Sequence, residues 1–235
     1  MSAANDFSGF ADALISWWKD HGRSFPWRFE RNPYRVLVAE TLLHRTRAEN
    51  VVPVYQHFIT VIPDNRSLAV ARENVILDMT RSLGLRWRVK LLPEAARIIE
   101  KEFGGTIPMD RKQLLSLPGV GDYITSAIRV FTGEFSDALM DTNTVRVISR
   151  IYGVGIKESA RRSEKMRIRY SKLRNGRDAR EFGYAMIDLA ATICLSGQPQ
   201  CYDCPVRPLC MAVRSLQKDK APALEAGRLK NTEKS

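Results

Sequence analysis

The stretch LLSLPGVGDYITSAI, residues 114–128, carries two runs of apolar residues at helical spacing with a proline and two glycines between them. A short helix is predicted to end at Pro118, and a second helix to start directly after Gly119, Val120 and Gly121. The glycines permit a tight turn, and a helix that starts there presents backbone N–H groups that suit a phosphate oxygen. The stretch predicts a helix-hairpin-helix that binds nucleic acid through these three residues. An ordinary turn between two helices is the alternative.

The rest of the chain is also predicted to be helical, with very little strand. Apolar residues recur at helical spacing in most segments between the prolines and glycines. The predicted helices cover residues 10–19, 36–46, 51–62, 73–83, 87–103, 111–118, 122–133 and 144–153. No repeat of fixed period is evident. The predicted fold class is all-α.

The charge of the chain indicates a polyanionic partner. Its 235 residues contain 37 Lys and Arg against 26 Asp and Glu, which gives a net charge of +11. Ten basic and three acidic residues fall between Lys157 and Arg180, and a basic helix face of this kind suits a phosphate backbone. Nucleic acid is the first candidate. A generally basic surface is the alternative.

The location of the protein is predicted from what the sequence lacks. No apolar run reaches the length of a membrane span, and the first residues, MSAANDFSGF, have no basic start of a signal peptide. We expect a cytoplasmic protein without a membrane partner, associated with the nucleoid if the source is prokaryotic. Its cysteines are then expected to be reduced.

All four cysteines fall within seventeen residues, as Cys194, Cys201, Cys204 and Cys210. Thiolates placed this closely can converge on one centre, and four-thiolate sites hold zinc or an iron–sulfur cluster. Zinc sites usually pair two short C-x2-4-C steps across a longer gap, whereas here one short step has a longer one on each side. The spacing favours the cluster. Zinc and two disulfides are the alternatives.

A further aspartate extends the pattern, since Asp141 follows Tyr123 by eighteen residues in the run ALMDTNTVRVISR. The hairpin, this aspartate and the cysteine loop, in this order and spacing, resemble the iron–sulfur branch of the helix-hairpin-helix DNA glycosylases. That branch includes endonuclease III, adenine DNA glycosylase and the thymine-DNA mismatch glycosylases, and the chain is most like the last. The resemblance runs from about Phe25 to Cys210, through FPWR (25–28), NPYRVLVAETLLHRT (32–46), GL (84–85), GGTIP (104–108), LPGVGDY (117–123), MDTNTVRV (140–147) and FGYAMIDLAATIC (182–194).

The resemblance implies two all-α domains with an active site in the cleft between them. Residues 25–137 are expected to form a six-helix barrel domain that contains the hairpin. Residues 1–24 and 138–213 are expected to form the domain whose four cysteines hold a [4Fe-4S] cluster. Residues 214–235 read as a polar tail that buries too little surface to become ordered.

The resemblance also assigns roles to Asp141 and Tyr123. A carboxylate beneath the anomeric carbon stabilises the positive charge that develops on the sugar when an N-glycosidic bond breaks, and Asp141 takes this place. The same residue suits the N-cap of the helix that follows, and both roles can hold at once. Tyr123 stands where endonuclease III has its imine-forming lysine, so efficient strand cleavage at the abasic site is not expected. The alternative for Tyr123 is packing at the start of a helix.

Glu40 is the third candidate catalytic residue. It lies in the apolar run VLVAETLLH, where a buried carboxyl group must be paired or must have a raised pKa. In the adenine-specific branch the glutamate at this place protonates the departing purine. Exposure on the far face of the helix is the alternative.

Four more residues are expected to contact DNA. His44 and Arg45 follow the same helix and are expected to face the gap that the flipped base leaves. Trp87 falls where the adenine enzyme has a tyrosine near the opposite base, and it either inserts into the base stack or belongs to the core. The loop LSGQPQ after Cys194 has no basic residue, so DNA contact is expected to shift to Arg207 and the basic stretch.

The predicted function is that of a monomeric, monofunctional DNA glycosylase acting on double-stranded DNA, with thymine or uracil opposite guanine as the preferred substrate. The adenine enzyme continues into a second domain that recognises 8-oxoguanine, whereas this chain ends soon after its cysteines. An adenine glycosylase acting opposite guanine or 8-oxoguanine is the first alternative. A non-catalytic DNA-binding module with a redox cluster is the alternative from another class, and it would not need both Asp141 and Glu40.

Overall fold

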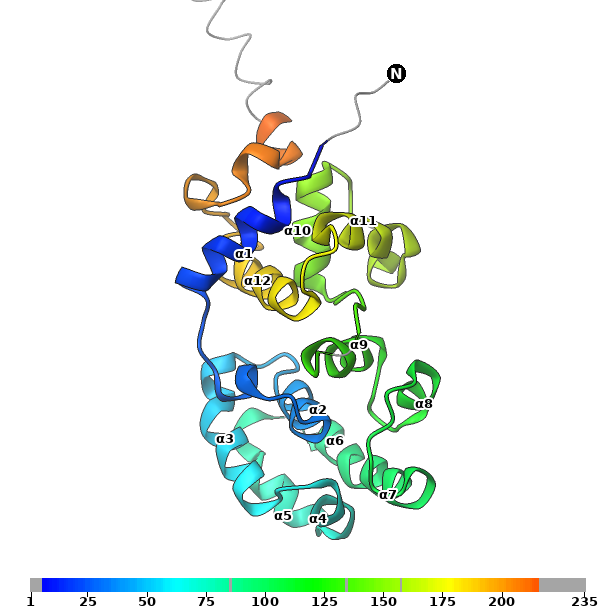
Figure 1. Ribbon diagram of the computed structural model, residues 1–235. Coiled ribbons are helices and arrows are strands. Elements are labelled where there is room, and N and C mark those ends of the chain that lie inside the picture. The colour runs from blue at the N-terminus through cyan, green and yellow to red at the C-terminus, as the bar shows by residue number, and fades with distance from the viewer. Residues whose placement is uncertain (1–5, 85, 134, 157, 216–235) are drawn as a thin grey trace, which may run out of the picture. The chain divides into compact units, whose positions relative to one another are not determined.

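The computed structural model describes residues 6–84, 86–133, 135–156 and 158–215, and within these ranges every regular element is a helix (Figure 1). The all-α prediction is confirmed. None of the described helices combines the length and the apolar composition needed to cross a lipid bilayer. Leu85 of the GL segment, Lys157 of the basic stretch and residues 216–235 of the predicted tail lie outside the described residues.

Contacts within the chain divide it into two units. We call Arg23–Leu139 the hairpin unit, and we call the described residues up to Gly22 together with those from Met140 onward the cysteine unit. The hairpin unit contains η1 (Pro26–Phe29), α2 (Pro33–Leu42), α3 (Ala48–Val61), α4 (Asn65–Val70), α5 (Glu73–Met79), η2 (Arg81–Leu83), α6 (Arg86–Val89), α7 (Leu91–Phe103), α8 (Arg111–Ser116) and α9 (Asp122–Phe131).

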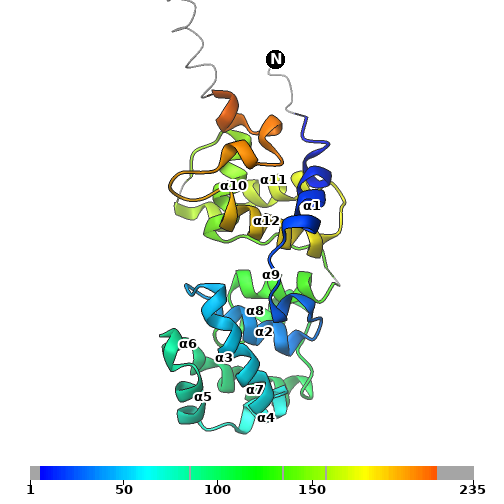
Figure 2. The same ribbon diagram turned by 90° about the vertical axis from the view of Figure 1, so that its left-hand side faces the viewer.

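Helix α2 is the centre of the hairpin unit and packs against α3, α6 and α9 (Figure 1, Figure 2). Asn32 sets its start, because its side chain accepts hydrogen bonds from the N–H groups of the first turn, and Pro33 follows in the first helical position. All side chains from Val36 to Leu42 are buried. A helix enclosed on every side holds its polar residues, Glu40 and Thr41, inside the unit.

Helices α4 and α7 pack side by side in the hairpin unit (Figure 2). Asn65 joins them, since its Nδ2 donates to Ala96 O at 3.1 Å and to Glu100 Oε1 at 2.8 Å. Helix α7 ends at Gly104, which has a φ of +60°. This pair carries none of the predicted site residues.

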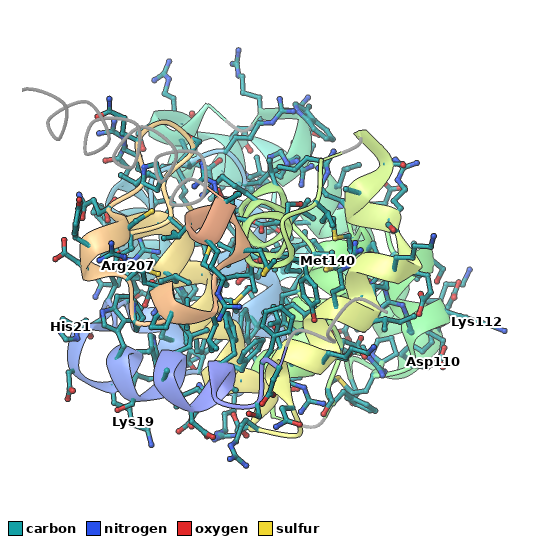
Figure 3. All side chains as sticks on the ribbon, turned by 90° about the horizontal axis from the view of Figure 1, so that it is seen from above. Lys19, His21, Asp110, Lys112, Met140 and Arg207 are labelled. Atoms are coloured by element: carbon teal, nitrogen blue, oxygen red, sulfur yellow. The ribbon has the colours of Figure 1, made fainter. Side chains whose placement is uncertain are left out.

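The cysteine unit is built around α12 (Ala179–Thr192), which contacts α1 (Phe10–His21) and α10 (Thr142–Tyr152). Phe182 lies at its core, with ring centroids 6.3 Å from Phe10 and 5.2 Å from Tyr170. The other elements are η3 (Glu158–Arg162), α11 (Glu164–Arg174), η4 (Cys201–Asp203) and η5 (Arg207–Leu209). Lys19 and His21 project from the last turn of α1 (Figure 3). The C-terminal end of a helix favours positive charge.

Several predicted helix boundaries were wrong. The helix predicted over 73–83 is divided into α5 and η2 at Thr80, whose hydroxyl donates to Ile76 O at 2.7 Å. The helix predicted over 87–103 is divided into α6 and α7 at Lys90. The helix predicted to end at Pro118 ends at Ser116. Arg214, at the start of the predicted tail, donates two hydrogen bonds to Pro208 O. This residue therefore still belongs to the folded cysteine unit.

Candidate functional site

The predicted hairpin joins α8 to α9. Gly119 has a φ of +78°, and a Cβ at this position would lie 3.2 Å from Leu91 Cβ, so both the backbone and the packing require glycine. Val120 is buried and fixes the turn to the core. Gly121 is the N-cap of α9 and has no side chain to cover the first turn of that helix. The three residues predicted for the hairpin thus build a tight turn that exposes backbone rather than side chains.

An arginine network that the sequence did not predict braces the hairpin. Arg111 in α8 forms ion pairs with Asp122 in the first turn of α9 and, at 2.9 Å, with Asp137. It also donates to Ser126 Oγ at 3.2 Å. Arg129 shares Asp137 at 2.8 Å. The two helices are therefore held at both ends of the turn, which fixes the direction of the α9 N-terminus.

Two of the predicted catalytic residues lie in the hairpin unit. Glu40 is 8% exposed in the middle of α2, so the alternative of an exposed glutamate is excluded. Its neighbour Thr41 is also buried and donates to Leu37 O at 2.8 Å. Tyr123 is half-buried in the first turn of α9. Both side chains thus belong to elements that the core holds rigidly.

The predicted DNA-contacting residues after α2 lie in a tight turn. His44 is half-buried and Arg45 is exposed. Arg45 has a φ of +58°, a conformation that side chains other than glycine rarely adopt. Trp87, in α6, is 65% exposed, which excludes the alternative that it belongs to the core. A large exposed ring is free to contact a partner.

Asp141 lies in the cysteine unit as the N-cap of α10. Its Oδ1 accepts the Thr144 N–H at 2.6 Å, and its Oδ2 accepts a hydrogen bond from Asn143 Nδ2 at 2.9 Å. The predicted capping role is therefore present. With both oxygens held, the carboxylate has a defined orientation at the start of α10.

A chain of hydrogen bonds runs from Asp141 along one face of α10 to the cysteine loop. Asn143 bonds Asp141 and accepts from Arg146 Nη1 at 2.9 Å. Arg146 then donates through Nε to Cys194 O and through Nη2 to Ala190 O, both at 2.9 Å. We call these contacts the α10 relay. They tie the orientation of Asp141 to the position of the first cysteine.

Arg150, one turn further along α10, anchors the same loop. It donates to Leu195 O at 2.6 Å and to Cys194 Sγ at 3.3 Å. Cys210 approaches the Arg150 carbonyl oxygen at 3.5 Å. The first and last cysteines of the run are therefore brought to one residue of α10.

All four cysteines are free thiols, which contradicts the two-disulfide alternative. Burial, together with a smaller effect of the charges of the three other cysteines, raises the pKa of Cys204 to about 11. Burial also raises the pKa of Cys210. Among the described residues no three His, Cys, Asp or Glu side chains are already arranged as metal ligands. The donor set, four neighbouring soft thiols on one loop, fits a thiolate-bound iron–sulfur cluster or zinc.

The surface near the cysteine loop is basic and aromatic. Arg207 lies in η5 with its guanidinium 4.7 Å from the ring centroid of Tyr202, a residue that is 86% exposed (Figure 3). In the basic stretch, the exposed cations are Arg161, Arg162, Lys165, Lys172 and Arg177, and Arg177 is paired with Asp12. Most of the exposed cations of this stretch are therefore available to an anionic partner.

Comparison with known proteins identifies DNA glycosylases as relatives of this chain. No protein-family model matches the chain. The chain is similar to the thymine-DNA glycosylase of Aeropyrum pernix, with 37% identity over 84% of this chain and 91% of that protein. It is also similar to the thymine/uracil-DNA glycosylase of Pyrobaculum aerophilum, with 34% identity over 86% of this chain and 90% of that protein. An adenine DNA glycosylase of Buchnera aphidicola is 29% identical, over 86% of this chain and 57% of that protein.

A solved structure agrees with these relatives. The structure of a thermostable thymine-DNA glycosylase superposes on the chain with a TM-score of 0.83 and 30% sequence identity. The match covers 89% of this chain and 97% of that one.

Proposed function

The chain belongs to the family of the thymine-DNA and thymine/uracil-DNA glycosylases, within the helix-hairpin-helix superfamily, and on this premise we propose that it removes thymine or uracil opposite guanine from double-stranded DNA. It is a DNA N-glycosylase, a hydrolase of the N-glycosidic bond. The observation that carries the proposed chemistry is the fixed carboxylate of Asp141, whose two oxygens are both hydrogen-bonded.

Asp141 acts on the charge of the transition state. As the bond to the base breaks, positive charge develops on the sugar, and an oriented carboxylate stabilises it without further reorganisation. The base must first leave the stack, and a mismatched base does so more easily than a paired one. This difference supports the preference for mismatches over ordinary pairs.

Tyr123 sets the outcome after base release. A phenol cannot form the imine that leads to β-elimination, so the product strand stays intact at the abasic site. With Asp141 stabilising the sugar cation and no imine-forming amine at position 123, the proposed reaction is monofunctional hydrolysis.

Glu40 supports the second candidate function. Glu40 is buried in the central helix, and the resemblance to the adenine enzymes gives the glutamate at this place the protonation of the departing adenine. Adenine release opposite guanine or 8-oxoguanine is therefore the alternative.

We assign the four cysteines, Cys194, Cys201, Cys204 and Cys210, as the ligands of a [4Fe-4S] cluster. When bound, such a cluster supplies a redox-active centre and cross-links the loop that carries its ligands. Arg146 and Arg150 hold the loop in place. The four thiols release their protons when they bind the cluster.

The DNA contacts follow from charge and backbone geometry. The hairpin residues 119–121 are assigned to phosphate, together with Arg207 and the exposed cations of the basic stretch. His44, Arg45 and Trp87 are assigned to the bases next to the excised one.

A panel of duplexes with one central pair tests the proposal. The pairs are T·G, U·G, A·G, adenine opposite 8-oxoguanine, and T·A as the control. We expect release of thymine and uracil opposite guanine, intact T·A, and strand breaks only after alkali. Release of adenine without release of thymine or uracil would replace the proposal by the adenine alternative.

A further inference from the structure

An acidic side chain lies at the turn that is assigned to DNA phosphate. Asp122 is the first residue of α9 and directly follows Gly121, the last residue of the hairpin. Its side chain is 41% exposed. A carboxylate at this place repels a phosphate, and it competes with the phosphate for the N–H groups of the helix N-terminus. The hairpin therefore binds a phosphate more readily if this charge is compensated.

Arg111 of α8 supplies an opposite charge at the start of α9. Its Nη2 donates to Asp122 Oδ1, and its Nη1 donates to Ser126 Oγ at 3.2 Å. Asp122 and Ser126 are four residues apart and lie on one face of α9, so the guanidinium spans the first turn of that helix. Because Ser126 is fully buried and the Arg111 side chain is only 31% exposed, the core holds the guanidinium at this place.

The second carboxylate that contacts Arg111 has another arginine as its partner. Asp137 Oδ2 lies 2.9 Å from Arg111 Nη1 and 2.8 Å from Arg129 Nε. We call Arg111, Asp122, Arg129 and Asp137 the α8–α9 charge cluster, and its formal charges cancel. Since Arg129 compensates Asp137, the charge of Arg111 serves Asp122. Removal of Arg111 alone would give this cluster a net charge of −1 beside the hairpin.

We propose that Arg111 is a positioning residue for DNA binding: it holds the Asp122 carboxylate toward α8 and cancels its charge, which leaves the first N–H groups of α9 to a phosphate. Arg111 acts through Asp122 and does not itself bind the phosphate. The N-cap residue, Gly121, has no side chain that could accept from these N–H groups. The inference rests on the proposed function, in which the hairpin binds phosphate, and it adds the ion pair that keeps the hairpin receptive to an anion.

Binding of the full chain to a duplex with a tetrahydrofuran abasic analogue opposite guanine tests the inference, because no base is released. Arg111→Met should weaken binding by about tenfold, the effect of one added negative charge close to a phosphate. Asp122→Asn removes the repelling charge and should tighten binding by about threefold or more. The double variant, Arg111→Met with Asp122→Asn, should bind within about threefold of the unmodified protein, because the cluster is again neutral.

The double variant separates this role of Arg111 from two others. If Arg111 only braces the two helices, Asp122→Asn cannot restore binding, and the double variant stays as weak as Arg111→Met. If Arg111 binds the phosphate itself, the double variant also stays weak, and the slope of log affinity against log salt falls by about one ion. Either result overturns the inference.

The matched control is Asp78→Asn in α5, an exposed aspartate of the same unit that forms no ion pair among the described residues. It should change binding by less than about twofold at moderate salt, where distant charges are screened. Should Arg111→Met not fold, as judged by circular dichroism, unchanged or weaker binding by Asp122→Asn alone overturns the inference. A protein that binds no duplex at all would contradict the proposed function instead, so the two failures are distinguishable.

Discussion

The α10 relay makes a specific prediction for Arg146→Met, which keeps most of the side-chain volume and removes three hydrogen bonds at 2.9 Å. The carbonyl groups of Ala190 and Cys194 lose their donor, and Asn143 loses the contact that holds its amide against Asp141. A hydrogen bond to a charged group contributes about 1.5–3 kcal/mol, less where water reaches it. With Arg146 half-buried, we expect the free energy of unfolding to fall by about 2–4 kcal/mol.

The effect on catalysis is expected to be separate from the effect on stability. In Arg146→Met, Oδ2 of Asp141 keeps only an unsupported Asn143, so the carboxylate samples other orientations. Small misplacements of a catalytic group reduce rates by about tenfold to a hundredfold. The measurement is single-turnover release of thymine from a T·G duplex at saturating enzyme, corrected for the folded fraction by circular dichroism.

Arg150→Met is the matched control, because Arg150 holds the same loop but makes no contact with Asn143 or Asp141 among the described residues. It should destabilise the protein by a comparable amount while the folded fraction keeps its rate. Asn143→Ala should show the reverse, a slow reaction with little loss of stability. Equal rates for Arg146→Met and Arg150→Met, per folded molecule, would refute the idea that the relay orients Asp141.

Four further predictions concern single features of the chain. Asp141→Asn should retain duplex binding and slow base release by about a hundredfold or more, and near-normal turnover would remove Asp141 from the mechanism. Tyr123→Lys should allow borohydride trapping of a covalent DNA adduct, whereas trapping by the unmodified protein would contradict monofunctional chemistry. Arg45→Gly should raise the free energy of unfolding by about 1 kcal/mol in thermal denaturation, because glycine adopts the left-handed conformation without strain; a less stable variant would argue against backbone strain. The purified protein should be brown with about four iron atoms per chain, and stoichiometric zinc without iron would overturn the cluster assignment.

The fold was largely predictable because its signals are local. Apolar periodicity gave the helical elements, and the start of α2 follows from Asn32 and Pro33, whose effects act within one turn. The hairpin was predictable for the same reason, since Gly119 is required by its own φ. The division at Lys90 was not predicted, although Pro93 indicates it: a proline has no N–H to donate and is tolerated in the first turn of a helix, where it lies in α7.

The site was predictable only where a motif placed it. The role of Asp141 was predicted from the resemblance and that of the cysteines from their spacing and the resemblance, and both stay predictions, whereas the burial of Glu40, predicted from its apolar neighbours, is confirmed. The side chains that support the site were not predicted from the sequence. Arg146 and the Cys194 carbonyl group are 48 residues apart, and Arg111 meets Asp137 across 26 residues. Such pairs depend on how helices pack, and an arginine in a basic chain gives no signal of which carbonyl or carboxylate it will meet.

The two roles of Asp141 have to be separated before any loss of activity is assigned to the chemistry. Asparagine is as good an N-cap as aspartate, so Asp141→Asn keeps the bond from the Thr144 N–H and removes mainly the charge. Its amide, however, would meet the Asn143 amide that now donates to Oδ2. Exchanging the two residues, with Asp141→Asn and Asn143→Asp together, restores a donor and an acceptor at this contact and keeps an acceptor for Arg146. If the charge at position 141 drives the reaction, the exchange recovers stability but not base release, whereas a recovered rate would show that the hydrogen-bonded geometry alone had been lost.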